Sequence, residues 1–204
     1  MGEESETEKK ACFKLGIFQN LFHLIDIQLR QTFSPTLHKN TAGYLAELPM
    51  KSLVVCFSYH HNNTQKIAEV MARVLEAQVK TPQQTNPGEL QQYDLVGFGA
   101  GIDSGKHYKV LLDFADKLPQ TANKKAFLFS TSGITGEEKI AKDHLALREK
   151  LQPKGYVIVG EFGCRGFNTN SFLRFFGGMN KGRPNAEDLR NAEVFALKLK
   201  QCKE

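Results

Sequence analysis

From Lys51 onward, short apolar runs alternate with segments of helical period, and this alternation limits the fold more than any other feature of the chain. The run Leu53–Phe57 is unbroken and apolar, as in a strand that is buried on both faces. The next segment places apolar residues on one face of a helix, at Ile67, Val70, Met71, Val74 and Leu75. Chains that alternate strands and helices form parallel sheets covered by helices on both faces.

The same pattern continues to the end of the chain. Further strands are predicted around Val79 and over residues 93–98, 126–129 and 156–159, and helical stripes over residues 110–118, 145–151 and 189–199. About five strands and about five helices fit an α/β fold, a three-layer, doubly wound domain with a five-stranded parallel sheet. Ligands of such sheets bind beyond the carboxyl ends of the strands, so we expect the loops there to carry the function.

Residues 1–49 are predicted to be an N-terminal extension of the domain at residues 50–204. An amphipathic helix within residues 13–29 could pack on the domain, bind a partner or lie on a membrane surface; alternatively, Met50 is the natural start and residues 1–49 are a gene-model extension. His23 and Asp26 interrupt the apolar stretch, which is too short to cross a bilayer. The preceding glutamates do not resemble a signal peptide, so a cytoplasmic location is expected.

Charge and cysteine spacing exclude several kinds of site. The net charge is +5, and residues 1–50 hold five basic and six acidic residues, so residues 51–204 carry 22 Lys or Arg against 16 Asp or Glu. No basic run and no zinc-finger spacing accompany this excess, and nucleic-acid binding is therefore not predicted. The four cysteines include no CxxC pair, so they predict neither a metal cluster nor a disulfide framework.

Three polar loops follow predicted strands and are the candidate binding elements. Ser58–Thr64 precedes a helix, where hydroxyls, amides and free N–H groups can bind a phosphate, although Asn63 or Thr64 could simply cap the helix. Gly99–Tyr108 has three glycines that let the backbone approach a planar ligand, without the spacing of a nucleotide P-loop. Ser130–Gly136 offers hydroxyls to a polar ring edge. A plain turn or solvent loop is the competing interpretation of the last two.

His60 and His61 raise the question of a metal site. Adjacent side chains point apart in extended backbone, and no neighbouring carboxylate or thiol completes a set of ligands. We therefore predict no metal site in the chain.

The order of these segments resembles the flavodoxin family over residues 51–200, especially its short single-domain members. The segments that carry the resemblance are Phe57–Ala68, Tyr93–Ile102, Phe129–Gly133 and Gly177–Asn185. The resemblance implies a flavodoxin-like sheet that binds FMN noncovalently and leaves the redox chemistry to that cofactor.

The resemblance also implies which residues contact FMN, and it implies no catalytic residue. The first loop would hold the phosphate through Ser58, His60, Asn62, Asn63 and Thr64. The flavin ring would lie between the second loop, with Gly99, Ala100, Gly101, Ile102 and His107, and the third loop, with Ser130, Thr131, Ser132 and Gly133.

Three departures from the family pattern bear on function. The first loop has two histidines, no glycine and one extra residue, so the roles of His60 and His61 are open. The chain has no Trp, so Tyr59 or Tyr108 would stack on the flavin. The body is basic whereas typical flavodoxins are acidic, and a basic rim would steer the protein toward acidic redox proteins or anionic substrates.

The expected function is electron transfer between redox partner proteins, without substrate chemistry of its own. The alternative on the same fold is an FMN-dependent reductase that oxidises NAD(P)H and reduces a quinone or a flavin. A third reading is a flavin-free binding module, in which Ser58–Thr64 only caps a helix.

Overall fold

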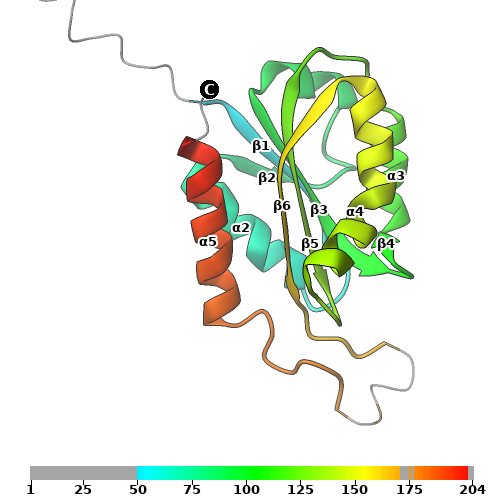
Figure 1. Ribbon diagram of the computed structural model, residues 1–204, viewed down its shortest axis with the longest axis vertical. Coiled ribbons are helices and arrows are strands. Elements are labelled where there is room, and N and C mark those ends of the chain that lie inside the picture. Colours follow the sequence, from blue (N-terminus) through cyan, green and yellow to red (C-terminus); the bar gives the residue numbers. More distant parts are fainter. Residues whose placement is uncertain (1–49, 171–174, 176, 202–204) are drawn as a thin grey trace, which may run out of the picture. The chain divides into compact units, whose positions relative to one another are not determined.

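The computed structural model describes residues 50–170, 175 and 177–201 of the chain (Figure 1). The predicted helix within residues 13–29, and the extension that contains it, lie outside the described residues. No helix of the described part is both long enough and apolar enough to span a membrane.

A single sheet forms the centre of the domain. Its parallel strands lie in the order β2-β1-β3-β5-β6. The strands are β1 (Ser52–Phe57), β2 (Gln78–Lys80), β3 (Leu95–Asp103), β5 (Lys124–Ser132) and β6 (Tyr156–Arg165). The short strand β4 (Lys106–His107) pairs antiparallel with the end of β3. The predicted five-stranded parallel sheet is therefore confirmed, with β4 as an addition.

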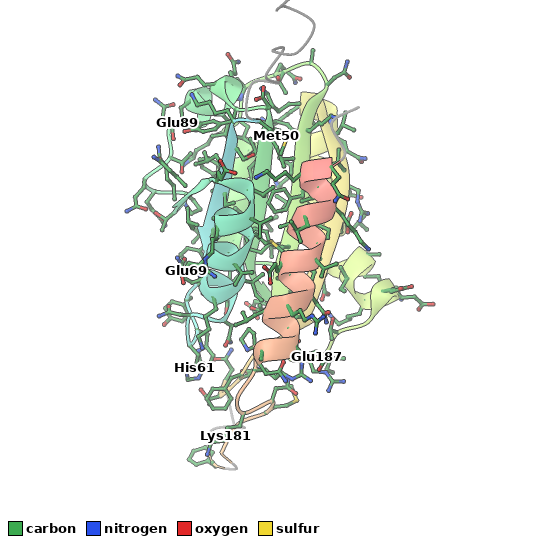
Figure 2. The ribbon with its side chains drawn as sticks, turned by 90° about the vertical axis from the view of Figure 1, so that its left-hand side faces the viewer. Met50, His61, Glu69, Glu89, Lys181 and Glu187 are labelled. Carbon is green, nitrogen blue, oxygen red and sulfur yellow. The ribbon has the colours of Figure 1, made fainter. Side chains whose placement is uncertain are left out.

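Helices cover both faces of the sheet (Figures 1 and 2). The helices α2 (Asn63–Leu75) and α5 (Ala186–Gln201) pack on one face, and α3 (Lys109–Asp116) and α4 (Glu137–Leu151) pack on the other. Two short 3-10 helices, η2 (Pro87–Gln92) and η3 (Gln152–Lys154), lie in the connections. The predicted three-layer architecture is confirmed.

The side chains of β1 show why the sheet separates two cores. Successive side chains of a strand point to opposite faces. Val54 and Cys56 are buried in the cluster that contains α2 and α5, whereas Leu53 and Val55 are buried in the cluster with α3 and α4. The unbroken apolar run of β1 therefore supplies both cores at once.

The strands β3 and β5 run further than predicted. Cys56 of β1 lies opposite Gly99, and Gly101 lies opposite Thr131 of β5. Residues 99–101 therefore lie within β3, which ends at Asp103, and residues 130–132 are the last residues of β5. Gly99 makes this pairing compatible with the core, because a Cβ there would lie 2.1 Å from Cζ of Phe129. The missing side chain at Gly99 therefore lets the ring of Phe129 pack against the sheet.

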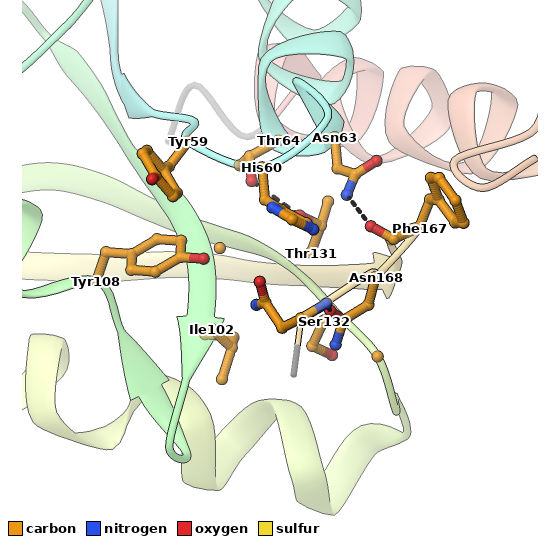
Figure 3. A pocket seen from close by; sticks show the side chains of 14 residues that line it. Tyr59, His60, Asn63, Thr64, Ile102, Tyr108, Thr131, Ser132, Phe167 and Asn168 are labelled. Carbon is orange, nitrogen blue, oxygen red and sulfur yellow. Dashed lines mark hydrogen bonds between the residues drawn. The ribbon is translucent and has the colours of Figure 1, made fainter. Parts of the chain in front are cut away.

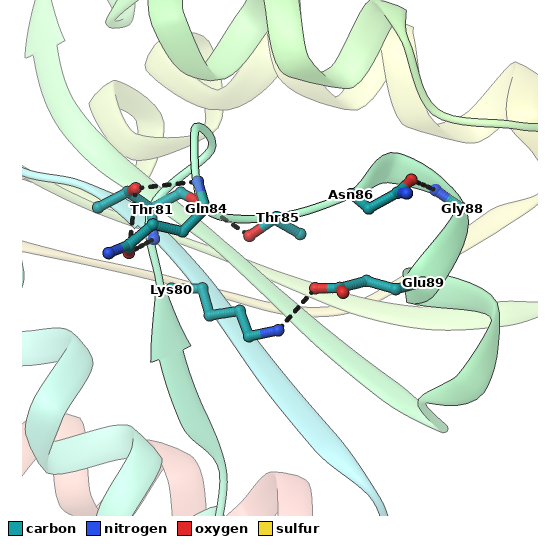
Figure 4. A network of polar contacts seen from close by, with 7 residues as sticks. All are labelled: Lys80, Thr81, Gln84, Thr85, Asn86, Gly88 and Glu89. Carbon is teal, nitrogen blue, oxygen red and sulfur yellow. Dashed lines mark hydrogen bonds and ion pairs between the residues drawn. The ribbon is translucent and has the colours of Figure 1, made fainter.

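The connection from β2 to η2 is held in place by polar contacts among its own residues (Figure 4). Lys80 Nζ lies 2.8 Å from Glu89 Oε1, and the Thr85 hydroxyl donates to the carbonyl of Thr81. Asn86 begins η2 by accepting a hydrogen bond from the N–H of Gly88 at 2.9 Å.

The strand order places the candidate site. The chain moves from β1 outward to β2 and then returns to the other side of β1 as β3. Crevices for ligands form beside such a reversal, at the carboxyl ends of the strands.

Candidate functional site

A pocket lies at the carboxyl ends of β1, β3 and β5 (Figure 3). Its wall combines the loop after β1, the end of β3, the end of β5 and the segment after β6. The lining residues are Tyr59, His60, Asn63, Thr64, Gly101, Ile102, Tyr108, Thr131, Ser132, Gly133, Gly166, Phe167, Asn168 and Asn170. None of these side chains is a carboxylate, an amine or a guanidinium.

The pocket brings together eight of the residues predicted to contact a cofactor. They are His60, Asn63, Thr64, Gly101, Ile102, Thr131, Ser132 and Gly133. The other six, Ser58, Asn62, Gly99, Ala100, His107 and Ser130, do not line it. Ala100 and Ser130 are buried within the ends of β3 and β5, and His107 is buried in β4.

The first loop leads into α2 without a side-chain cap. His61 and Asn62 have φ values of 54°, and this left-handed turn leads directly into α2. The Asn62 side chain makes no capping hydrogen bond, and the first turn of α2 has no acidic residue. Ser58 Oγ is buried without a hydrogen-bond partner. A hydroxyl without a partner beside an uncapped helix start suits an anionic ligand.

Thr64 joins the first loop to the third. Its Oγ1 lies 2.8 Å from Oγ1 of Thr131, and both side chains are buried. This hydrogen bond ties the start of α2 to the end of β5, so the two loops keep a fixed separation across the pocket.

Two tyrosines form the side of the pocket near β3. Tyr59 and Tyr108 meet edge to face, with ring centroids 6.4 Å apart. Gly101 allows this, because a Cβ there would lie 2.6 Å from Cε2 of Tyr108. Burial raises the pKa of the Tyr108 hydroxyl. Together with Ile102, these rings provide apolar surface for a planar group.

Four lining residues that follow β6 were not predicted from the sequence. Gly166, Phe167, Asn168 and Asn170 belong to the glycine-rich segment after the last strand. Asn63 Nδ2 donates to the Phe167 carbonyl at 2.8 Å, and Asn180 Nδ2 donates to the Gly133 carbonyl at 2.7 Å. The segment is thus fastened to the first and third loops. Amides and an aromatic directly after a strand were the available signal.

His60 and His61 do not point apart, as extended backbone would require. Their ring centroids lie 4.2 Å apart, and both Nε2 atoms approach Oγ1 of Thr169, at 3.0 and 2.9 Å. The left-handed conformation of His61 turns the two rings to the same side. Burial lowers the pKa of His60, and the neighbouring His61 lowers it further.

A buried polar cluster lies behind the third loop. His144 Nε2 is 2.9 Å from Ser130 Oγ, and His144 Nδ1 is 3.1 Å from Glu161 Oε2. The ring of His107 lies 4.7 Å from that of His144. Burial would raise the pKa of Glu161, but hydrogen bonds from His144 and Arg148 outweigh it and hold this pKa below its ordinary value. Ser130 is therefore a structural link between this cluster and β5.

The residues present fit the cofactor that the sequence resemblance implies. The unpartnered Ser58 hydroxyl and the uncapped start of α2 suit a phosphate, and Tyr59, Tyr108 and Ile102 suit a flat ring. The hydroxyls and amides of the wall can hydrogen-bond the polar edges of such a ring.

Two comparisons with known proteins bear on the family of this chain. A family model described as a flavodoxin domain matches residues 54–197. An uncharacterized protein of Methanocaldococcus jannaschii is 44% identical over 147 residues, which cover 72% of this chain and 96% of that protein.

Solved structures share the fold. The oxidised flavodoxin 2 of Bacillus cereus superposes with a TM-score of 0.56 at 20% identity, covering 74% of this chain and 98% of that chain. A flavodoxin from the domain Archaea gives 0.51 at 17% identity, covering 74% and 97%. At these identities the likeness concerns the fold alone.

Proposed function

Because the chain belongs to the flavodoxin family, we propose that it binds FMN noncovalently and carries electrons between redox proteins. The observation that carries this proposal is the pocket beside the reversal of strand order, where an uncapped helix start and a pair of tyrosines share one wall. The bound flavin would supply the redox chemistry, and the chain would position it.

Each part of the pocket has a role in this proposal. The start of α2 would hold the phosphate, and Ser58, which lies on the same loop without lining the pocket, would donate a hydrogen bond to it. Tyr59 and Tyr108 would cover the ring and keep water from it. The third loop, fixed to the first through Thr131 and Thr64, would set the position of the ring edge.

Exposed apolar side chains near the pocket support the transfer of electrons to another protein. Tyr59 is 75% exposed, and Ile134, directly after the lining residue Gly133, is 64% exposed. Apolar residues of this exposure beside a site suit a surface that meets a partner. With a net charge of +5, the partner would be an acidic redox protein.

A visible spectrum tests the proposal. The purified full chain is titrated with FMN under anaerobic conditions, then with NAD(P)H and finally with dithionite. A carrier binds FMN, changes its spectrum, and is reduced by dithionite but not by NAD(P)H. A protein that takes up no FMN contradicts the proposal.

The same titration separates the alternative function. If NAD(P)H bleaches the bound flavin at a catalytically useful rate, and a quinone restores the colour, the protein is an FMN-dependent reductase. Free FMN without protein serves as the control for direct reduction by NAD(P)H.

A further inference from the structure

The two adjacent histidines of the first loop share one hydroxyl. Thr169 Oγ1 lies 3.0 Å from His60 Nε2 and 2.9 Å from His61 Nε2. The N–H of Thr169 also donates to His60 Nε2, at 3.2 Å. A ring nitrogen that accepts a hydrogen bond carries no proton, so His60 is neutral, with its proton on Nδ1. Thr169 therefore holds His60 in its uncharged form.

The described residues that contact the two rings carry no charge that would balance a proton. His60 faces His61 from its own loop, Asn63 from α2, and Thr169 from the segment after β6. His61 also packs against the ring of Phe167, at 4.4 Å. Within residues 50–170, 175 and 177–201, neither ring forms an ion pair with a carboxylate. Burial and the neighbouring His61 imidazole therefore both disfavour a charge on His60.

His60 lines the pocket, on the loop that also carries the unpartnered Ser58 hydroxyl. Because phosphate monoesters have a second pKa of about 6, the phosphate of FMN is mostly a dianion at neutral pH. A dianion close to an imidazole favours the protonated ring and raises its pKa by roughly 1–3 units.

We infer that His60 and His61 exchange Thr169 for the phosphate of FMN, and that the protein takes up a proton from solution when FMN binds. The inference rests on the proposed function, since it requires FMN in this pocket. The proton goes to Nε2 of His60, which then donates to a phosphate oxygen instead of accepting from Thr169. No bond is made or broken other than this N–H.

The direction of proton transfer distinguishes this arrangement from binding by neutral groups alone. At pH 7.5 the free phosphate is already mostly dianionic, so a cradle of N–H and hydroxyl groups would bind it with no proton exchange or with slight release. A neutral His60 imidazole that becomes charged beside the phosphate gives uptake of up to one proton instead. Riboflavin has the same ring and no phosphate, so its binding would exchange no proton.

The test is isothermal titration calorimetry of the full, flavin-free chain with FMN at pH 7.5, in three buffers of different ionisation enthalpy. We expect uptake of between about half and one proton per FMN, and none with riboflavin. For full uptake, FMN affinity falls up to about tenfold per pH unit above neutrality, while riboflavin affinity stays level.

Variants locate the proton. His60→Gln and His61→Gln both keep a hydrogen-bonding side chain. Each should weaken FMN binding without changing riboflavin binding, and His60→Gln, which cannot become charged at this position, should also abolish the proton uptake. Thr169→Val is the matched control: it removes the competing hydroxyl and leaves both rings, so uptake should persist and FMN should bind at least as tightly. Circular dichroism checks that each variant is folded.

Two outcomes overturn the inference. If FMN binds without proton uptake, or if uptake persists in the His60→Gln/His61→Gln double variant, the histidines do not hold the phosphate, while the proposed function stands. If neither FMN nor riboflavin binds the native chain, the proposed function fails and the inference fails with it.

Discussion

At the scale of single residues, one buried polar atom can lower the stability of the fold and still favour ligand binding. Ser58 is the first example. Its Oγ is buried and has no hydrogen-bond partner. A buried hydroxyl of this kind destabilises the fold by roughly 1–3 kcal/mol. A ligand that supplies the missing hydrogen-bond partner would offset this destabilisation, and the phosphate of the proposed cofactor could do so.

Replacing Ser58 by Ala should separate stability from binding. The Ala variant should be as stable as the native chain or more stable by about 1 kcal/mol, because no protein hydrogen bond is lost. It should bind FMN about tenfold more weakly. Urea unfolding of the flavin-free protein and fluorescence titration with FMN measure the two effects. Riboflavin is the control, since its affinity should not change; equal loss for both flavins would contradict the phosphate assignment.

His107 is a residue whose burial should make stability depend on pH. It is 1% exposed, its Nδ1 has no partner, and burial, assisted by the nearby His144, lowers its pKa to about 3. The unfolded chain binds a proton at this residue below an ordinary pKa of about 6.5, whereas the folded chain does not. Its contribution to stability is therefore complete above pH 6.5 and is lost as the pH falls toward 3.

His107→Phe keeps the ring and removes the titration. Between pH 6.5 and 4, the free energy of unfolding of the native chain should fall by about 1.4 kcal/mol per pH unit from this group, and the variant should lack that part of the slope. Urea unfolding at pH 7.5 and pH 5 measures the difference within each protein, so any general cost of the substitution cancels. Parallel slopes in the two proteins would contradict the assignment.

At the scale of elements, the order and type of the strands were predictable because the apolar periods are strong. The run Leu53–Phe57 could only be a strand buried on both faces, and the structure confirms it as β1. The ends of strands were not predictable. Gly99 was interpreted as a loop residue that lets the backbone approach a planar ligand. In the structure its backbone pairs with Cys56, and its missing side chain leaves room for the ring of Phe129.

The candidate site was predictable where local sequence determines it and not where distant contacts do. Thr64 stands out as a hydroxyl at a predicted helix start and Thr131 as a hydroxyl after a predicted strand, and both line the pocket. The rings of His60 and His61 lie close together because His61 has a positive φ. Sequence predicts this conformation mainly at glycine and asparagine, so at a histidine it was not foreseeable. Phe167 and Asn168 line the pocket because the segment after β6 folds back toward the start of α2. No hydrophobic period in the sequence predicts this fold-back.

The turn from η3 into β6 depends on one glycine. Gly155 has a φ of 86°, and a Cβ there would lie 1.9 Å from the carbonyl oxygen of Thr121. Gly155→Ala should therefore destabilise the fold by more than about 2 kcal/mol, since backbone must move in addition to the left-handed strain.

Gly182→Ala is the matched control for this prediction. Gly182 has nearly the same φ, 84°, but a Cβ there would meet no atom within 4 Å. We expect it to cost only about 1 kcal/mol, the strain alone. Thermal unfolding of the two variants measures the difference. If both variants lose the same stability, the close approach of Thr121 does not matter.

At the scale of the whole molecule, the net charge of the chain should determine whether an anionic or a cationic redox partner is attracted to it. The chain carries +5 at pH 7. Once the flavin is reduced, oxidation by the anionic ferricyanide should slow as ionic strength rises, because salt screens an attraction over about 10 Å at 0.1 M. Oxidation by a cationic ruthenium hexaammine should accelerate. Stopped-flow absorbance measures both rates, and the two oxidants serve as each other's control; a common salt dependence would show that charge does not steer the encounter.

The packing of α5 also has a consequence for synthesis on the ribosome. Phe127 and Phe129 belong to the core that Ala192, Ala196 and Leu199 of α5 close. More than 60 residues are translated between Phe129 and Ala192, which takes roughly three to twelve seconds at ordinary rates of elongation. During that interval the part of this sheet face that α5 covers in the folded domain is exposed, with α2 alone packed on it. The yield of the protein in cells should therefore depend on chaperone capacity while α5 is still being made.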